Sequence, residues 1–209
     1  MLLFGHIGLT IGISKVFQDL ITLKRPDFRK SHPYDEPTAI KENDDNLLNK
    51  IREKVKFTDY RLILLGCLLP DIIDKPMWLF TNNTLKWDGR GYSHTFLFTL
   101  VLLIIGLVLA VRWKKAWLLT ISIGSIFHLI FDQMWLNPTA LWWPLLGPIP
   151  REVIPEYFSY LWKDFLANPF TYISESVGLL VTLFIIISII RRKKVMHFLK
   201  TGDLGFIFR

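Results

Sequence analysis

The stretch LLGCLLPDIIDKPMWLF, residues 64–80, decides how the rest of the sequence is interpreted. Most of it is apolar enough to enter a membrane, yet it carries two carboxylates, Asp71 and Asp74. Burying an unpaired carboxylate costs several kcal/mol or more. These two side chains therefore need partners, and the partners must come from elsewhere in the sequence.

The composition is that of a membrane protein. Of the 209 residues, 51% are hydrophobic and 14% aromatic, the mean hydropathy is +0.34, and the apolar residues come in long blocks. The net charge of +7 is compatible with nucleic-acid binding. However, the basic residues flank the apolar blocks, where orientation in a bilayer explains them better. We therefore expect a lipid bilayer as partner and no nucleic acid. The single cysteine, Cys67, excludes a disulfide framework.

Five apolar blocks are candidates for membrane helices, each of which needs about 20 residues to span. They are residues 3–23, 60–80, 95–111, 117–136 and 170–190. The first block lacks the basic start and cleavage site of a removable signal, so we expect it to be retained. The prediction is an all-α fold, a polytopic membrane bundle of about five helices that forms one integral domain over residues 1–209.

Two long connections separate these blocks. Residues 24–59 are polar, and DDNLLNKIREKVKF (residues 44–57) places apolar side chains on one helical face. This pattern fits an amphipathic helix at a membrane surface or on the domain, and equally a solvated linker with one helix. Residues 137–169 are rich in tryptophan and tyrosine among prolines. Such aromatic density is typical of the membrane interface.

Basic clusters orient the blocks. They follow the first block at residues 24–30, the third at 112–115 and the fifth at 191–194. The positive-inside rule places all three ends, and with them the C-terminus, in the cytoplasm. We therefore expect a multi-pass protein of the inner (cell) membrane with its 137–169 connection on the extracytoplasmic side.

With this topology, seven ionisable side chains from five segments fall at a similar depth on the extracytoplasmic side. They are His6, Asp71, Asp74, His94, His128, Asp132 and Glu175. The topology was assigned from lysines and arginines alone, so the common depth of these seven residues is an independent observation. Intramembrane ionisable residues are functional by default. We expect His32 and His197, by contrast, to be solvated on the cytoplasmic side.

The spacing and chemistry of these residues favour a metal. His128 and Asp132 are four apart and so share a helical face, as do Asp71 and Asp74 if the helix continues past Pro70. Imidazoles and carboxylates in a low-dielectric pocket suit a divalent cation. Mixed ligands of this kind favour zinc, with manganese and iron as alternatives, and several carboxylates allow one or two ions.

Each residue also has a simpler structural explanation. His6 fits a satisfied interfacial histidine, and the two aspartates of the second block fit the end of a short helix. His94 follows Ser93, a plausible N-cap, and so fits a first-turn position. The pair of His128 and Asp132 fits a structural hydrogen bond. Glu175 fits a residue that supports the site without ligating a metal.

Four motifs resemble the LexA-regulated, inner-membrane-associated hydrolase family, whose members are described as predicted membrane-bound metal-dependent hydrolases. They are GHIGLTIG (5–12), LLPDIID (68–74), GRGYSHTFLF (89–98) and FHLIFDQMWLNPTALWWPLLG (127–147). The resemblance covers roughly the first 145 residues. A fainter likeness to zinc-dependent phospholipases C adds little.

The resemblance implies a hydrolase without naming its substrate. It carries over to His6, Asp71, Asp74, His94, His128 and Asp132, which occupy the positions of the family's motifs. One departure is Gly89, where the family often has a histidine before the arginine. If that histidine is a ligand, this chain has lost a metal site or recruits Asp88.

The resulting hypothesis is a metal-dependent hydrolase of a phosphoester or other ester in a lipid or lipid-linked substrate. A metal-activated water would attack the bond, Asp74 or Glu175 would take its proton, and Arg90 would bind an anionic group. The alternatives are a metal or proton transporter, for which Lys15, Gln18 and Asp19 would continue a polar path, and a non-catalytic metal-binding membrane protein.

Overall fold

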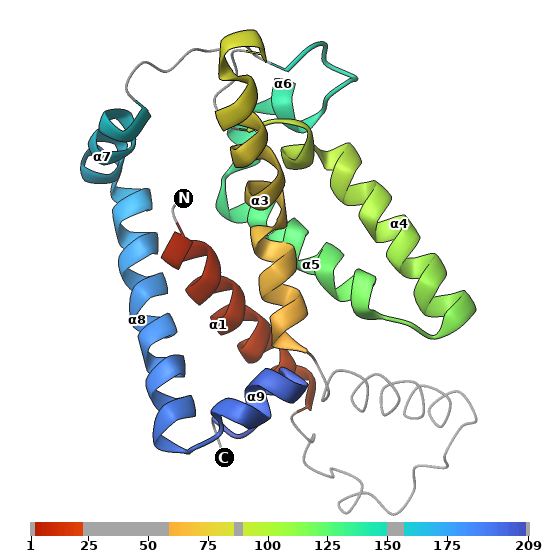
Figure 1. The fold of residues 1–209 in the computed structure, drawn as a ribbon, viewed down its shortest axis with the longest axis vertical. Coiled ribbons are helices and arrows are strands. Elements are labelled where there is room, and N and C mark those ends of the chain that lie inside the picture. The colour runs from red at the N-terminus through yellow and green to blue at the C-terminus, as the bar shows by residue number, and fades with distance from the viewer. Residues whose placement is uncertain (1–2, 23–58, 86–89, 150–156, 208–209) are drawn as a thin grey trace, which may run out of the picture.

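The computed structural model of the chain describes residues 3–22, 59–85, 90–149 and 157–207, and in these residues it is helical, with no strand (Figure 1). The elements are α1 (Leu3–Thr22), α3 (Tyr60–Leu85), η2 (Tyr92–His94), α4 (Phe96–Trp113), α5 (Trp117–Phe131), η3 (Met134–Leu136), α6 (Pro138–Leu141), α7 (Tyr157–Ala167), α8 (Pro169–Arg191) and α9 (Val195–Thr201). The connection predicted for residues 24–59 lies outside the described residues except for Asp59, and so does Gly89.

The all-helical prediction is confirmed, and each of the five apolar blocks contains a helix. Among the described residues, α4 and α8 are long and apolar enough to cross a membrane, whereas α5, with 15 residues, is a shorter apolar helix. Only 11% of the α4 window and 33% of the α8 window are buried inside the protein. The core helix of a soluble protein would be mostly buried, so these exposed apolar faces suit contact with lipid.

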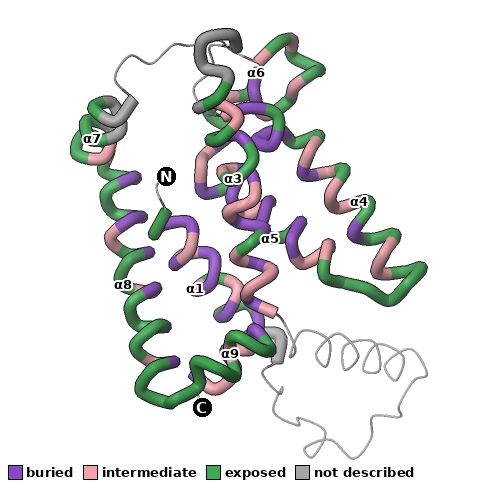
Figure 2. Tube along the Cα trace, in the orientation of Figure 1, coloured by how far each residue is buried: buried purple, intermediate pink, exposed green. Residues whose placement is uncertain are grey.

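The inside of the bundle is unusually polar. Buried positions include threonines, serines, histidines and carboxylates from α1, α3, α5 and α8, while many large apolar side chains of α4 and α8 are exposed. Figure 2 shows the buried stretches on the sides of these helices that face one another. An apolar cluster that includes Ile11, Tyr60, Ile185 and Leu204 fills the end of the bundle near the C-terminus. Polar groups occupy the other end.

Helix α3 continues through Pro70, which is the condition under which Asp71 and Asp74 were expected to share a helical face. A proline removes the hydrogen bond to the carbonyl four residues earlier, here that of Gly66. The Ser125 hydroxyl of α5 donates to that carbonyl oxygen at 3.0 Å. A side chain from a neighbouring helix therefore replaces the lost bond, and α3 reaches Leu85 with Asp71 and Asp74 inside it.

Helix α5 ends at Phe131, earlier than the predicted residue 136. Asp132 is its C-cap, and its backbone N–H still donates to the His128 carbonyl at 2.9 Å. Gln133 then adopts a left-handed conformation (φ 51°), which turns the chain into η3. Asp132 is thus held one turn beyond His128 but at the end of the helix.

Two helix pairs touch backbone to backbone at glycines. Where α1 packs on α8, a Cβ added to Gly8 would lie 2.0 Å from the Gly178 carbonyl oxygen. Where α3 packs on α5, a Cβ added to Gly66 would lie 2.0 Å from the Ile121 carbonyl oxygen. Small residues at such crossings let helices approach closely in membranes. These contacts leave no room for a methyl group.

We predict that Gly8→Ala lowers the stability of the protein by about 1–3 kcal/mol, because the methyl group forces α1 away from α8. The matched control is Gly12→Ala on the same helix, where the added Cβ would meet only a Val181 side-chain atom at 3.5 Å. Thermal unfolding of both variants in detergent measures the difference. Equal midpoints for the two would contradict the close crossing.

Candidate metal centre

The polar end of the bundle gathers side chains from four elements. His6 comes from α1, Asp71 and Asp74 from α3, His94 from η2, and His128 from α5, with Asp132 capping α5. Their rings and carboxylates are joined through short contacts. The structure therefore brings together all six residues that the sequence analysis proposed as metal ligands.

Asp74 anchors the turn that carries His94. It is fully buried, and its carboxylate accepts hydrogen bonds from the backbone N–H groups of Gly91 (2.8 Å) and Ser93 (3.2 Å). The same oxygen, Oδ2, faces His94 Nδ1 at 2.7 Å. A carboxylate on one ring nitrogen fixes the ring and leaves the other nitrogen to bind a metal. The geometry thus gives Asp74 a supporting place behind His94 rather than a place among the converging ligand atoms.

Three ligand atoms converge on the other side of the His94 ring. His94 Nε2 lies 3.0 Å from His128 Nε2 and 3.5 Å from Asp71 Oδ1, and His128 Nε2 lies 3.9 Å from Asp71 Oδ1. Two metal–ligand bonds of about 2.1 Å span at most about 4.2 Å, so one cation can reach all three atoms. This donor set fits a divalent ion.

Asp132 lies at the edge of this group. Its Oδ2 is 4.0 Å from His94 Nε2 and accepts from Arg90 Nε at 3.2 Å. Its Oδ1 is 3.1 Å from His6 Nε2. The side chain of Arg90 is 40% exposed, whereas that of Asp132 is 6% exposed. Asp132 therefore connects the buried histidines to the positively charged guanidinium group of Arg90, which is partly exposed at the surface.

Electrostatics favour a positive charge at this point. Burial lowers the pKa of His94, but its hydrogen bonds with Asp71 and Asp74 and the nearby carboxylate of Asp132 raise the pKa to about 9. His94 lies in η2, outside the long helices. The surrounding carboxylates thus stabilise a cation, and a bound metal would take the place of the ring proton.

Glu175 has a different position. Asn168 and Pro169 begin α8 as its N-cap and first residue, so Glu175 lies well inside the helix. Its Oε2 accepts from the backbone N–H of Gly5 at 3.0 Å, while Oε1 is buried with no partner among the described residues. Glu175 thus holds the first turn of α1, next to His6, and is not among the converging ligand atoms.

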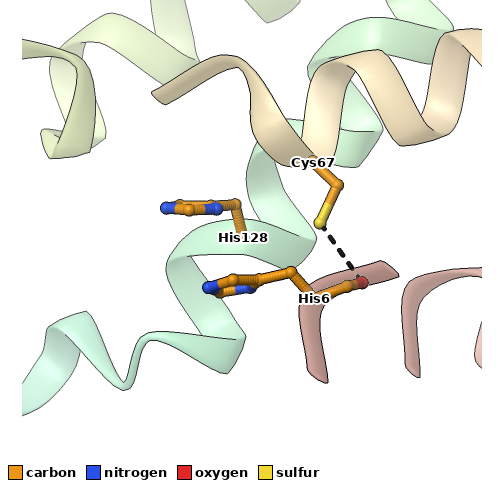
Figure 3. Close-up of side chains that lie close together, drawn as sticks. All are labelled: His6, Cys67 and His128. Atoms are coloured by element: carbon orange, nitrogen blue, oxygen red, sulfur yellow. Dashed lines mark hydrogen bonds between the residues drawn. The ribbon is translucent and has the colours of Figure 1, made fainter. Parts of the chain in front are cut away.

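Sequence reasoning missed Cys67, which lies between α1 and α5 close to two of the histidines. One nitrogen of His6, one of His128 and the Cys67 sulfur all lie within 4.8 Å of one another. Figure 3 shows the two imidazole rings one above the other with Cys67 beside them. The available signal was spacing, because Cys67 precedes Asp71 by four residues and so shares its face of α3.

Together these features define a helical membrane protein with a buried cluster of histidines and aspartates at one end of the bundle. Comparison with known families is more specific. Residues 46–197 match the family that is described as YdjM inner membrane protein. It therefore belongs to this family of inner-membrane proteins. The matched region contains Asp71, Asp74, His94, His128 and Asp132, while His6 precedes it. No curated protein and no solved structure matches the chain.

We predict that Asp74→Asn weakens metal binding about 10–100-fold, the usual effect of removing a hydrogen-bonded partner from a ligating histidine. The amide cannot accept all the hydrogen bonds that the carboxylate accepts from Gly91, Ser93 and His94. Competition with a chromophoric chelator measures the zinc affinity. Asp203→Asn, on an exposed carboxylate near His197, is the matched control. Unchanged affinity in Asp74→Asn would show that His94 needs no such support.

Proposed function

We propose that the protein is a membrane-bound, metal-dependent hydrolase whose centre is Asp71, His94 and His128. The observation that carries this proposal is the convergence of one oxygen and two nitrogens within 3.9 Å of one another, at a buried position. Buried polar groups of this kind need a partner, and a cation satisfies all three at once. Zinc suits the two imidazoles best, with manganese and iron as alternatives.

A divalent ion held here supplies an acidified water for attack on a phosphoester or other ester bond. Among the carboxylates, Asp132 is best placed to take the proton of that water, because its Oδ2 lies 4.0 Å from His94 Nε2. This geometry replaces Asp74 and Glu175 as the favoured base, since Asp74 lies at the Nδ1 side of the His94 ring, away from the converging ligand atoms, and Glu175 accepts from Gly5.

The position of Arg90 favours a substrate that carries an anionic group. Its guanidinium contacts Asp132, and its side chain is 40% exposed, so it lies between the surface and the centre. An arginine in this position suits a phosphate group, which it binds through charge-assisted hydrogen bonds. Ester hydrolysis would release an acid and an alcohol, and the arginine would hold the acid.

Membrane placement suggests the substrate. We propose that α1, α3, α4, α5 and α8 all lie in the bilayer, with the centre on the extracytoplasmic side. The basic residues after α4 and α8 are exposed at the ends of these helices opposite the centre, which supports this orientation (Figure 1). A centre at headgroup depth favours a lipid or lipid-linked phosphoester.

We predict that His94→Ala abolishes stoichiometric metal binding and lowers phosphoester hydrolysis on the order of 100-fold or more, since the metal that activates water is lost. Metal content of the detergent-purified protein and turnover of a panel of phosphoesters and acyl esters are the measurements. His197→Ala is the matched control, because His197 is an exposed histidine that pairs with Asp203 at 3.6 Å. Full metal content in His94→Ala would refute the ligand assignment.

A metal or proton transporter is the rival function, and one observation favours it. Polar side chains continue along the buried face of α1 away from His6, at Thr10, Lys15 and Gln18, and Gln18 accepts from the Tyr60 hydroxyl at 2.6 Å. Ion pathways are lined by such groups. Metal uptake into sealed proteoliposomes without ester hydrolysis would favour transport. Bound metal with neither activity would favour a non-catalytic metal-binding protein.

The orientation makes a separate prediction. Reporters fused after Lys115 and after Arg209 should behave as cytoplasmic, because these points follow the basic clusters of the third and fifth blocks. A reporter fused after Trp143 should behave as exported. The measurement compares one reporter that is active only in the cytoplasm with one that is active only after export. The opposite pattern would place the centre on the cytoplasmic side.

A further inference from the structure

We infer that His6, Cys67 and His128 form a second cation site, distinct from the centre of Asp71, His94 and His128 and selective for a thiophilic ion such as zinc. The site lies between α1, α3 and α5, each of which contributes one ligand. This second site is independent of the proposed hydrolysis, because an ion could bind there whether or not the protein catalyses that reaction.

The three groups are close enough for one ion. A nitrogen of each histidine and the Cys67 sulfur all lie within 4.8 Å of one another. Zinc bonds of about 2.1 Å to nitrogen and about 2.3 Å to sulfur at tetrahedral angles hold these atoms about 3.6 Å apart, so side-chain movements of up to about 1 Å would close the site. The two rings are stacked, with centroids 4.4 Å apart and planes inclined by 19°, and Cys67 lies to one side of the pair (Figure 3).

The Nδ1 atoms are the ring nitrogens that remain for this site. Nε2 of His6 is taken by Asp132, and Nε2 of His128 by His94. Nδ1 of each ring is buried and has no hydrogen-bond partner among the described residues, although both side chains are essentially fully buried. Leaving a buried polar atom unpaired costs about 1–3 kcal/mol. A shared cation would satisfy both atoms.

The chemistry of the donors selects the ion. Two imidazoles and a thiolate form a soft set that suits zinc or copper(I) and disfavours magnesium or calcium. The thiol now contacts the Thr10 hydroxyl at 2.9 Å and the His6 carbonyl oxygen at 3.6 Å. These oxygens hold the sulfur in place and would remain beside it after its proton leaves.

His128 belongs to both sites. Its Nε2 faces His94 and Asp71, and its Nδ1 remains for Cys67 and His6. On α3, Cys67 and Asp71 lie four residues apart on one face, so the ring of His128 lies against both. An imidazole that binds ions through both nitrogens bridges them, and the two sites then share one rigid ring.

Filling both sites brings four positive charges to a region that holds the carboxylates of Asp71, Asp74 and Asp132. The Cys67 thiolate and the loss of the remaining ring proton of His128 add two negative charges. Binding at the second site therefore releases the thiol proton and this ring proton to solvent, and no oxidant or reductant is needed.

Cobalt(II) titration of the metal-free, detergent-purified chain under anaerobic conditions tests this inference. The wild type should bind two ions and show the near-ultraviolet absorption of a thiolate bound to cobalt. Cys67→Ser should bind one ion without that absorption. Asp71→Asn should also bind one ion but keep the absorption, and His128→Ala should lose both ions.

Serine at position 67 keeps a hydrogen-bonding group for Thr10 and the His6 carbonyl, so it separates metal loss from loss of packing. Thermal unfolding of the metal-free variants checks their folding, and Cys67→Ala gives a second variant. A wild type saturated with cobalt but lacking thiolate absorption would overturn the inference. So would an unchanged ion count in Cys67→Ser. Failure of hydrolysis in all variants leaves this test intact, because its readout is the bound ion.

Discussion

The polar centre depends on how closely the helices approach one another. At Gly66 the backbone of α3 touches that of α5, and at Gly8 the backbone of α1 touches that of α8. Asp71 follows the first crossing by five residues, and His6 precedes the second by two. Helices are stiff, so a crossing fixes the separation of side chains one turn away. Without Gly66, Asp71 of α3 and His128 of α5 would stand too far apart to share a cation, while Gly8 holds α1 against α8, where Glu175 accepts from Gly5.

The positions of the helices were predictable because long apolar blocks in a sequence usually form membrane helices. The ends of the helices were harder to predict. Pro70 suggests a break in any single-sequence interpretation, and α3 passes through it only because Ser125 of another helix donates to the freed carbonyl. The early end of α5 at Phe131 depends on the left-handed Gln133 and its turn. The first feature is a tertiary contact and the second is an unusual backbone conformation of one residue, and local propensity carries little information about either.

The ionisable residues of the centre were found from sequence because a topology set by lysines and arginines placed them at one depth. Their separate roles required coordinates. Asp71 and Asp74 lie three apart on one helix, yet Asp71 faces the ring nitrogens of two histidines while Asp74 holds the backbone of η2. The spacing of four residues between Cys67 and Asp71 was the one signal for Cys67, and it is a weak one, since a cysteine in an apolar run is ordinarily a small buried side chain.

The turn at η2 explains how a ligand outside the long helices can be held rigidly. Three residues of a 3₁₀ turn make few hydrogen bonds of their own. Asp74 supplies the missing acceptor for two backbone N–H groups and for the ring of His94, and the Ser93 hydroxyl donates to the Pro70 carbonyl at 2.8 Å. These donors satisfy the buried oxygens of Asp74. Asp74 therefore holds the geometry of the turn, and the neighbouring carboxylates Asp71 and Asp132 remain for the proposed metal.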